Sequence, residues 1–152
     1  MRGFAIAFFC LAIPLMAIGE PRWCSVSSRD TSNTIVYVPI AAAAQVQGEA
    51  RARIIYSPNS RVERVEPVSG VPMLLEPLAG QLSNWTVRSN ASGHELCQTL
   101  VIATFMLRKP SRSWTRKQKV KFTTGPNAIH VLISRPRPEI ETDTSSPALK
   151  GS

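Results

Sequence analysis

The stretch Leu96–Leu107 (LCQTLVIATFML) decides the fold, because it is the most apolar part of the chain outside the N-terminus. It is rich in β-branched and aromatic residues, and the basic pair Arg108-Lys109 and then Pro110 end it. A run that is apolar on both faces is typical of a strand that is covered on each side. We therefore predict a central strand here.

The residues before this stretch predict a β-hairpin. From Glu49 to Tyr56 apolar and polar residues alternate with the period of a half-buried strand. The turn-forming cluster Ser57–Ser60 follows, and extended structure resumes over Arg61–Val68. Two strands joined by so short a connection form a hairpin.

A helix should follow the hairpin, with Pro72 in its first turn. Apolar residues recur there at steps of three and four, which gives one stripe that packs on a sheet. Pro77 predicts a kink in this helix or a start after it. The stripe consists of Val71, Leu74, Leu75, Leu78, Leu82 and Trp85.

Three more segments complete the expected fold. Thr34–Ile40 (TIVYVPI) predicts a short edge strand, Ala41–Val46 a helical turn, and Ala128–Ser134 (AIHVLIS) a last strand. The fold class that we predict is α+β, with a small antiparallel sheet of three to five strands and one helix packed across one face.

The N-terminus is typical of a secretory signal peptide. Arg2 precedes an uncharged apolar run that ends at Gly19 and is shorter than a membrane-spanning helix needs. We expect export to the periplasm or cell envelope, and the alternative is an inner-membrane anchor formed by an uncleaved leader. The expected plan is a leader over 1–19, an irregular lead-in over 20–34, a domain over 35–135 and a disordered tail over 136–152. The domain divides into a core (35–108), a basic loop (109–127) and an extra strand (128–134).

Two cysteines remain once the leader is removed, Cys24 and Cys97. An exported protein meets an oxidising environment, where such a pair can form a disulfide. Two separate buried thiols are the alternative, and the spacing of the two residues does not decide between them.

The chain is basic, with 18 Lys and Arg against 10 Asp and Glu. No acid lies between Leu96 and Pro138, and this span holds a basic patch that suits anionic headgroups or polymers. A solvated loop is the alternative, and we expect no nucleic acid partner because the chain is exported. The patch consists of Lys109, Arg112, Arg116, Lys117, Lys119 and Lys121.

The motifs that mark common active sites are missing from the sequence. It has no G-x-S-x-G elbow, no phosphate-binding loop, no dinucleotide glycine pattern and no metal-ligand spacing. We therefore expect no enzymatic activity, no cofactor and no metal.

The order of hairpin, helix and strand, with these residues, resembles the C-terminal domain of the TonB energy-transducer family. The resemblance covers about residues 35–108 and depends on Gly48, Ser69-Gly70 and Trp85. Tyr37-Val38-Pro39 and the alanines of 41–44 fit the family's start. It implies a periplasmic protein that binds an envelope or outer-membrane transport partner, such as a receptor, in energy-coupled transport.

The resemblance also implies how the partner binds, as a strand added beside the one that ends at Arg108. The implied partner-binding residues are Leu96, Gln98, Leu100, Ile102, Thr104, Met106 and Arg108. About 20 residues separate Gly19 from Ile40, where the family has a proline-rich spacer. This short distance favours the alternative, a free-standing secreted structural or interaction module that keeps the fold without energy transduction.

Overall fold

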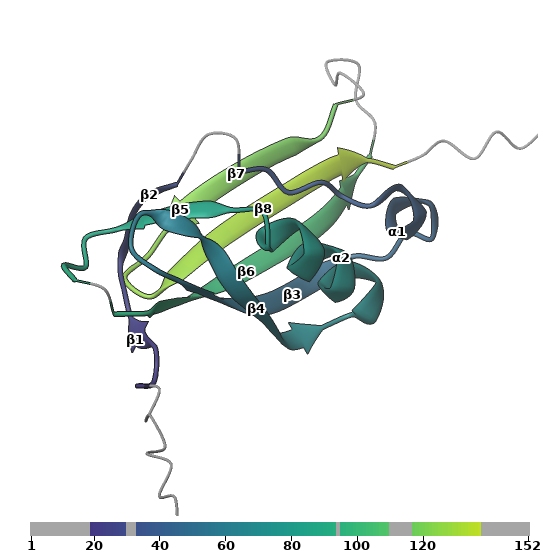
Figure 1. Ribbon diagram of the computed structural model, residues 1–152. Helices are drawn as coiled ribbons and strands as arrows, with labels where there is room; N and C mark the ends of the chain where they lie inside the picture. Colours follow the sequence, from purple (N-terminus) through teal and green to yellow (C-terminus); the bar gives the residue numbers. More distant parts are fainter. Residues whose placement is uncertain (1–18, 30–32, 94, 110–116, 138–152) are drawn as a thin grey trace, which may run out of the picture.

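The computed structural model describes residues 19–29, 33–93, 95–109 and 117–137, and within them it has one eight-stranded sheet and two helices (Figure 1). Most of the expected leader and most of the expected tail lie outside these residues. The helices are α1 (Pro39–Ala43) and α2 (Pro72–Leu82). The strands are β1 (Arg22–Trp23), β2 (Val26–Arg29), β3 (Gly48–Tyr56), β4 (Ser60–Gly70), β5 (Thr86–Ser89), β6 (Cys97–Arg108), β7 (Lys119–Thr124) and β8 (Ala128–Pro136).

The sheet curls into a nearly closed, barrel-like structure with α2 packed against it (Figure 1). The strand order is β2-β5-β4-β3-β6-β8-β7, and β1 pairs with the start of β6. Strand β6 is parallel to β1 and β8, whereas every other pair is antiparallel. The prediction of a small antiparallel sheet of three to five strands with one helix is therefore wrong.

The extra strands come from segments that the sequence patterns assigned to loops. Strands β1 and β2 lie in the expected lead-in, β5 follows the helix, and β7 lies in the expected basic loop. In β7, Lys119 and Lys121 are exposed while Val120 and Phe122 are partly buried, so the segment alternates like any half-buried strand. The many Lys and Arg residues in and before it led to its prediction as a loop.

Strand β6 is central, as predicted, but only one of its faces is fully buried. Its odd-numbered residues from Cys97 to Leu107 are buried, and its even-numbered residues are partly or largely exposed. The odd-numbered side chains meet those of β3 and β8 in the barrel interior, where Ile54, Val101 and Ile133 are completely buried. The outer face of β6 therefore remains accessible in the described part of the chain.

The hairpin and the helix form as expected. Strands β3 and β4 pair antiparallel, and the turn between them contains Asn59 with a positive φ of 61°. At the far end of the hairpin Gly70 has a φ of 139°, and a Cβ there would lie 2.8 Å from the Cα of Ala50. Only glycine tolerates both this backbone conformation and this close approach.

Helix α2 begins at Pro72 and continues through Pro77, so a start after Pro77 is ruled out. Leu74, Leu78 and Leu82 form its buried face, in agreement with the predicted stripe. Trp85 follows the helix and is 2% exposed. Its indole Nε1 donates a hydrogen bond to the Thr34 carbonyl at 3.3 Å, and its ring lies 5.9 Å from that of Phe122 on β7.

The expected edge strand Thr34–Ile40 is instead an extended segment, residues 33–38, that is assigned to no strand pairing within the described residues; α1 begins at Pro39. We call this segment the strap. Ile35 and Tyr37 point into the core with no exposed surface, whereas Val36 is half exposed. The burial of the strap's side chains thus alternates as in a β-strand, although the strap is assigned to no strand pairing within the described residues.

Two glutamine side chains supply the hydrogen bonds that a neighbouring strand would give the strap. The Val36 N–H donates to Oε1 of Gln81 at 2.6 Å, and Nε2 of Gln81 donates to the Val36 carbonyl at 3.1 Å. On the other side the Tyr37 N–H donates to Gln118 Oε1 at 2.6 Å, and Gln118 Nε2 donates to the Ile35 carbonyl at 2.5 Å. Gln81 comes from α2 and Gln118 immediately precedes β7, so the strap connects the helix with the edge of the sheet.

We predict that Trp85→Ala lowers the free energy of unfolding by about 3–5 kcal/mol, because it empties the space of a large buried ring. The matched control is Trp23→Ala, since the Trp23 side chain is 45% exposed and should cost less than about 1 kcal/mol. Urea denaturation of both variants measures the difference. Equal midpoints for the two variants would contradict the packing described here.

We predict that Gln118→Ala lowers the free energy of unfolding by about 1–3 kcal/mol, because the Tyr37 N–H loses its acceptor in a buried place. Gln118→Glu should also destabilise the protein, since a carboxylate has no proton to donate to the Ile35 carbonyl. The neighbouring, exposed Lys117→Ala is the control and should leave the urea midpoint unchanged. If the glutamine variants were as stable as this control, the strap would not depend on Gln118.

Candidate anion-binding site

The edge of β6 at which the resemblance places a partner strand is already occupied. On one side β3 pairs with β6 from Cys97 to Phe105, and on the other β8 pairs with it from Leu100 to Arg108. Strand β1 extends the second side by pairing with Cys97 and Gln98. A partner therefore has access to β6 through its outer side chains and not through its backbone.

The expected partner-binding residues lie on this outer face. Gln98, Leu100, Ile102 and Thr104 are partly buried, whereas Met106 and Arg108 are exposed. Leu96 precedes the strand, and its carbonyl accepts a hydrogen bond from the Arg22 N–H at 2.8 Å. The predicted partner-binding residues thus lie in one row on the outer face. The strand edge to which the partner strand was expected to add is occupied by neighbouring strands.

A pocket of about 520 Å³ lies on the outer face at the C-terminal ends of β6 and β8. Three cationic side chains line it, from Arg108 on β6 and from Lys119 and Lys121 on β7. Leu132 and Ser134 of β8 also line it, and Ser134 is 6% exposed. The register explains this convergence, because Lys121 lies opposite Leu132 and Lys119 lies opposite Ser134. Val120 completes the lining.

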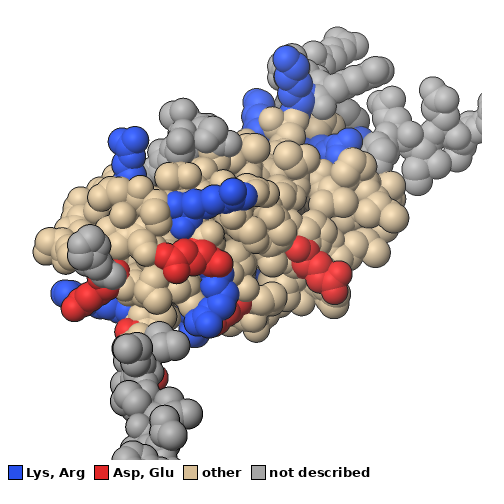
Figure 2. Space-filling model, in the orientation of Figure 1, with Lys and Arg blue, Asp and Glu red and all other residues tan. Residues whose placement is uncertain are grey.

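The C-terminal part of the described chain carries cations and no carboxylates. Between Cys97 and Arg137 there are seven described Lys or Arg and no acid: Arg108, Lys109, Lys117, Lys119, Lys121, Arg135 and Arg137. Figure 2 shows Lys and Arg at the upper edge of the molecule, where β7 and the end of β8 lie in Figure 1, and further Lys and Arg lower down beside the carboxylates.

Three described carboxylates outside this stretch have cationic neighbours of their own. Glu49 pairs with Arg51, Glu66 pairs with Arg53 and Arg64, and Glu95 lies 3.9 Å from Arg22. Arg108, Lys119 and Lys121 concentrate positive charge at one pocket, and this charge would attract an anion. The hydroxyl of Ser134 and the three cations are the groups that such an anion would meet.

The predicted basic patch is thus only partly brought together. Lys119 and Lys121 line the pocket, Lys109 and Lys117 are exposed and do not line it, and Arg112 and Arg116 lie outside the described residues. Sequence analysis placed Arg108 among the strand-binding residues and missed Leu132 and Ser134. The alternation of Lys119-Val120-Lys121-Phe122 is the signal that could have placed both lysines on one face of a strand.

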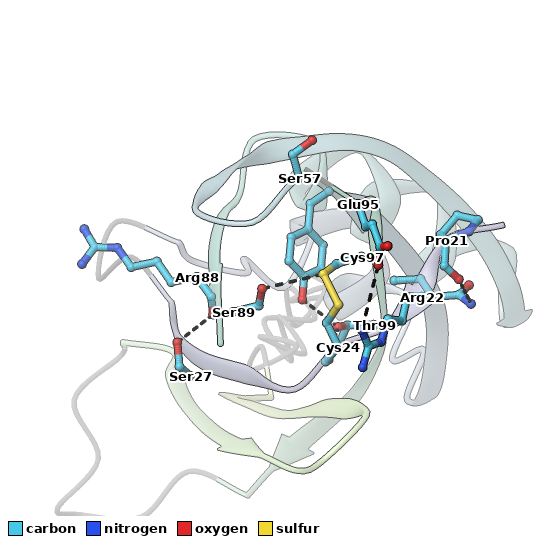
Figure 3. Close-up of a disulfide and its surroundings, with 12 residues drawn as sticks. Pro21, Arg22, Cys24, Ser27, Ser57, Arg88, Ser89, Glu95, Cys97 and Thr99 are labelled. Atoms are coloured by element: carbon cyan, nitrogen blue, oxygen red, sulfur yellow. Dashed lines mark hydrogen bonds and ion pairs between the residues drawn. A yellow bond between two sulfur atoms is a disulfide. The ribbon is translucent and has the colours of Figure 1, made fainter. Parts of the chain in front are cut away.

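The cysteine pair lies at the opposite end of β6, where the Sγ atoms of Cys24 and Cys97 are 2.03 Å apart and the Cα atoms 5.4 Å apart (Figure 3). This is the geometry of a disulfide. Backbone hydrogen bonds fix the same segment, since the Cys24 N–H donates to the Gln98 carbonyl at 3.2 Å. The Gln98 side chain returns a bond to the Pro21 carbonyl at 2.7 Å.

A buried hydrogen-bond chain lies beneath the disulfide. The Thr99 hydroxyl donates to the Cys24 carbonyl at 3.1 Å, and the Tyr56 hydroxyl lies 3.0 Å from Thr99 Oγ1. Since Thr99 has given its proton to the carbonyl, Tyr56 is the donor between them. Burial raises the pKa of Tyr56 above its ordinary value of 10.0, and the contact with Thr99 lowers it in part. Burial likewise raises the pKa of Tyr37, and the charge of Arg135 partly offsets this.

The described residues contain neither a membrane-crossing helix nor a metal-ligand cluster. No helix among them is long and apolar enough to cross a membrane. They contain no group of three or more His, Cys, Asp or Glu side chains that could hold a metal ion.

Comparisons of the chain with protein-family models, with curated proteins and with solved structures find no match. The resemblance to the TonB family therefore stays a prediction.

We predict that the protein loses stability as the pH rises above about 10. The two tyrosines ionise at their ordinary pKa in the unfolded chain and only at higher pH in the folded chain, so the folded state holds more protons in that range. Stability from this source is complete below pH 10 and falls above it. Because the chain has two tyrosines, tyrosinate absorbance reports both directly. Two tyrosines that titrate near pH 10 without unfolding would contradict the prediction, and Tyr56→Phe should weaken the pH dependence.

Proposed function

We propose that this chain is an exported, free-standing interaction module that binds an anionic partner at the basic pocket. The observation that carries the proposal is the convergence of Arg108, Lys119 and Lys121 on one pocket, in a stretch of chain that has no carboxylate. Phosphate, carboxylate or sulfate groups would suit these cations and the nearby hydroxyl of Ser134.

The disulfide supports the exported location. Disulfides persist in oxidising compartments and are rare in the cytosol. The bond between Cys24 and Cys97 joins two residues that are 73 positions apart in the sequence. It holds β1 against β6 and so forms part of the structure of the sheet. Residues 1–18 lie outside the described structure, and both a cleaved leader and a retained anchor stay predictions.

The alternative function, energy-coupled transport through strand addition, has less support. Its binding mode needs a free edge of β6, and β3 and β8 occupy both edges from Leu100 to Phe105. To free one edge, a partner would have to displace β8 and expose Ile129, Val131 and Ile133, which are at most 1% exposed. The cost of exposing three such side chains is about 5–9 kcal/mol, comparable to the whole stability of a typical domain.

We predict that the wild-type protein binds short-chain polyphosphate at low ionic strength, and that added salt weakens this binding. The double variant Arg108→Gln/Lys121→Gln should bind at least about tenfold more weakly, because two cations at the pocket are lost. Isothermal titration calorimetry measures both affinities. NMR shifts confined to β7 and the ends of β6 and β8 would locate the ligand.

The matched control is Arg88→Gln, which removes an exposed cation on β5, outside the pocket. Its side chain projects away from the disulfide region in Figure 3. It should keep the wild-type affinity. No binding by the wild type, or an equal loss in the control, would refute the proposed function.

A further inference from the structure

The outer face of the sheet carries an apolar stripe that leads to the basic pocket. It follows β6 and includes residues of β1 and β8, which both pair along one side of β6, and we define the outer stripe as Trp23, Leu100, Ile102, Met106 and Leu132. The register places them on one face, because Trp23 lies opposite Gln98 and Leu132 lies opposite Thr104. Trp23 is 45% exposed and Met106 is 39% exposed, and the other three are partly buried.

Cationic side chains border the stripe along its length. Arg53 on β3 lies opposite Leu100, and its guanidinium is 5.8 Å from the centre of the Trp23 ring. Arg51 is next along β3, opposite Ile102. At the other border Lys121 and Lys119 lie on β7, and the pocket lies at the end of the stripe. Glu49 and Glu66 are the acids paired with the arginines of this face, so cations remain in excess.

The outer stripe and its cations extend along β6 on the outside of the curled sheet. From Gln98 to Arg108 the strand spans roughly 33 Å, and neighbouring strands add about 5 Å each in width. Apolar side chains in the middle and cations around them match the surface of a bilayer that contains anionic lipids. Exposed Trp and Met side chains enter the headgroup region, and Lys and Arg side chains contact the phosphates.

We propose that the partner of this face is the surface of an anionic lipid bilayer, with the outer stripe against the headgroups and the pocket holding one lipid phosphate. This inference rests on the proposed function, because it uses the same pocket. It adds the source of the anion and a second, apolar component of binding. A soluble polyanion would use the cations and leave the stripe in water.

The experiment is cosedimentation of the full chain with vesicles of phosphatidylglycerol and phosphatidylcholine in equal parts, with pure phosphatidylcholine vesicles for comparison. The wild type should bind only the anionic vesicles, and each cation removed from the pocket should weaken binding about fivefold. Trp23→Ser/Met106→Ser should weaken vesicle binding at least about tenfold and change the affinity for polyphosphate by less than about twofold. Neither of these two residues lines the pocket.

The matched control is Ile40→Ser/Met73→Ser, which removes two exposed apolar side chains from α1 and α2 instead of the outer stripe. It should bind vesicles like the wild type. Unchanged vesicle binding by the stripe variant, or equal losses in both double variants, would overturn the inference. Binding to polyphosphate without binding to vesicles would also overturn it while the proposed function stands. Failure to bind either probe would overturn both.

Discussion

The pairing of β6 on both of its edges is the constraint on which the rest of the structure depends. Strand β6 contributes alternate side chains to the core, and its neighbours β3 and β8 contribute the side chains that meet them there. Because β8 runs parallel to β6, the chain between them must return along the molecule, and β7 forms on that return beside β8. This return brings Lys119 and Lys121 beside Arg108. The basic pocket is thus a consequence of the strand order.

The N-terminal part of the described chain completes the barrel without forming long strands. Strand β1 continues the edge that β8 leaves at Leu100, and the disulfide fixes it to β6. The strap then covers the space between α2 and β7, where the side chains of Gln81 and Gln118 pair with its backbone. Both N-terminal segments are thus held by the elements that they cover.

The sequence predicted those elements whose signal is local. The alternation in β3, the leucines of α2 and the apolar run of β6 each lie within one element, and each produced the expected structure. The strand order was not predictable in this way, because pairing of β6 with β8 depends on contacts between distant residues. The strap was misread because Ile35 and Tyr37 alternate like strand residues, and nothing nearby shows that two distant glutamines replace a neighbouring strand.

The sequence predicted the positive charge of the candidate site but not the arrangement of its side chains. The absence of acids from Leu96 to Pro138 indicated an anion-binding surface, but only the fold shows which cations converge there. The most direct test of this account is residue-resolved hydrogen exchange of β6. We expect slow exchange for all amides from Leu100 to Phe105, both those directed at β3 and those directed at β8. Rapid exchange of every second amide would show that one edge is free and would contradict the account.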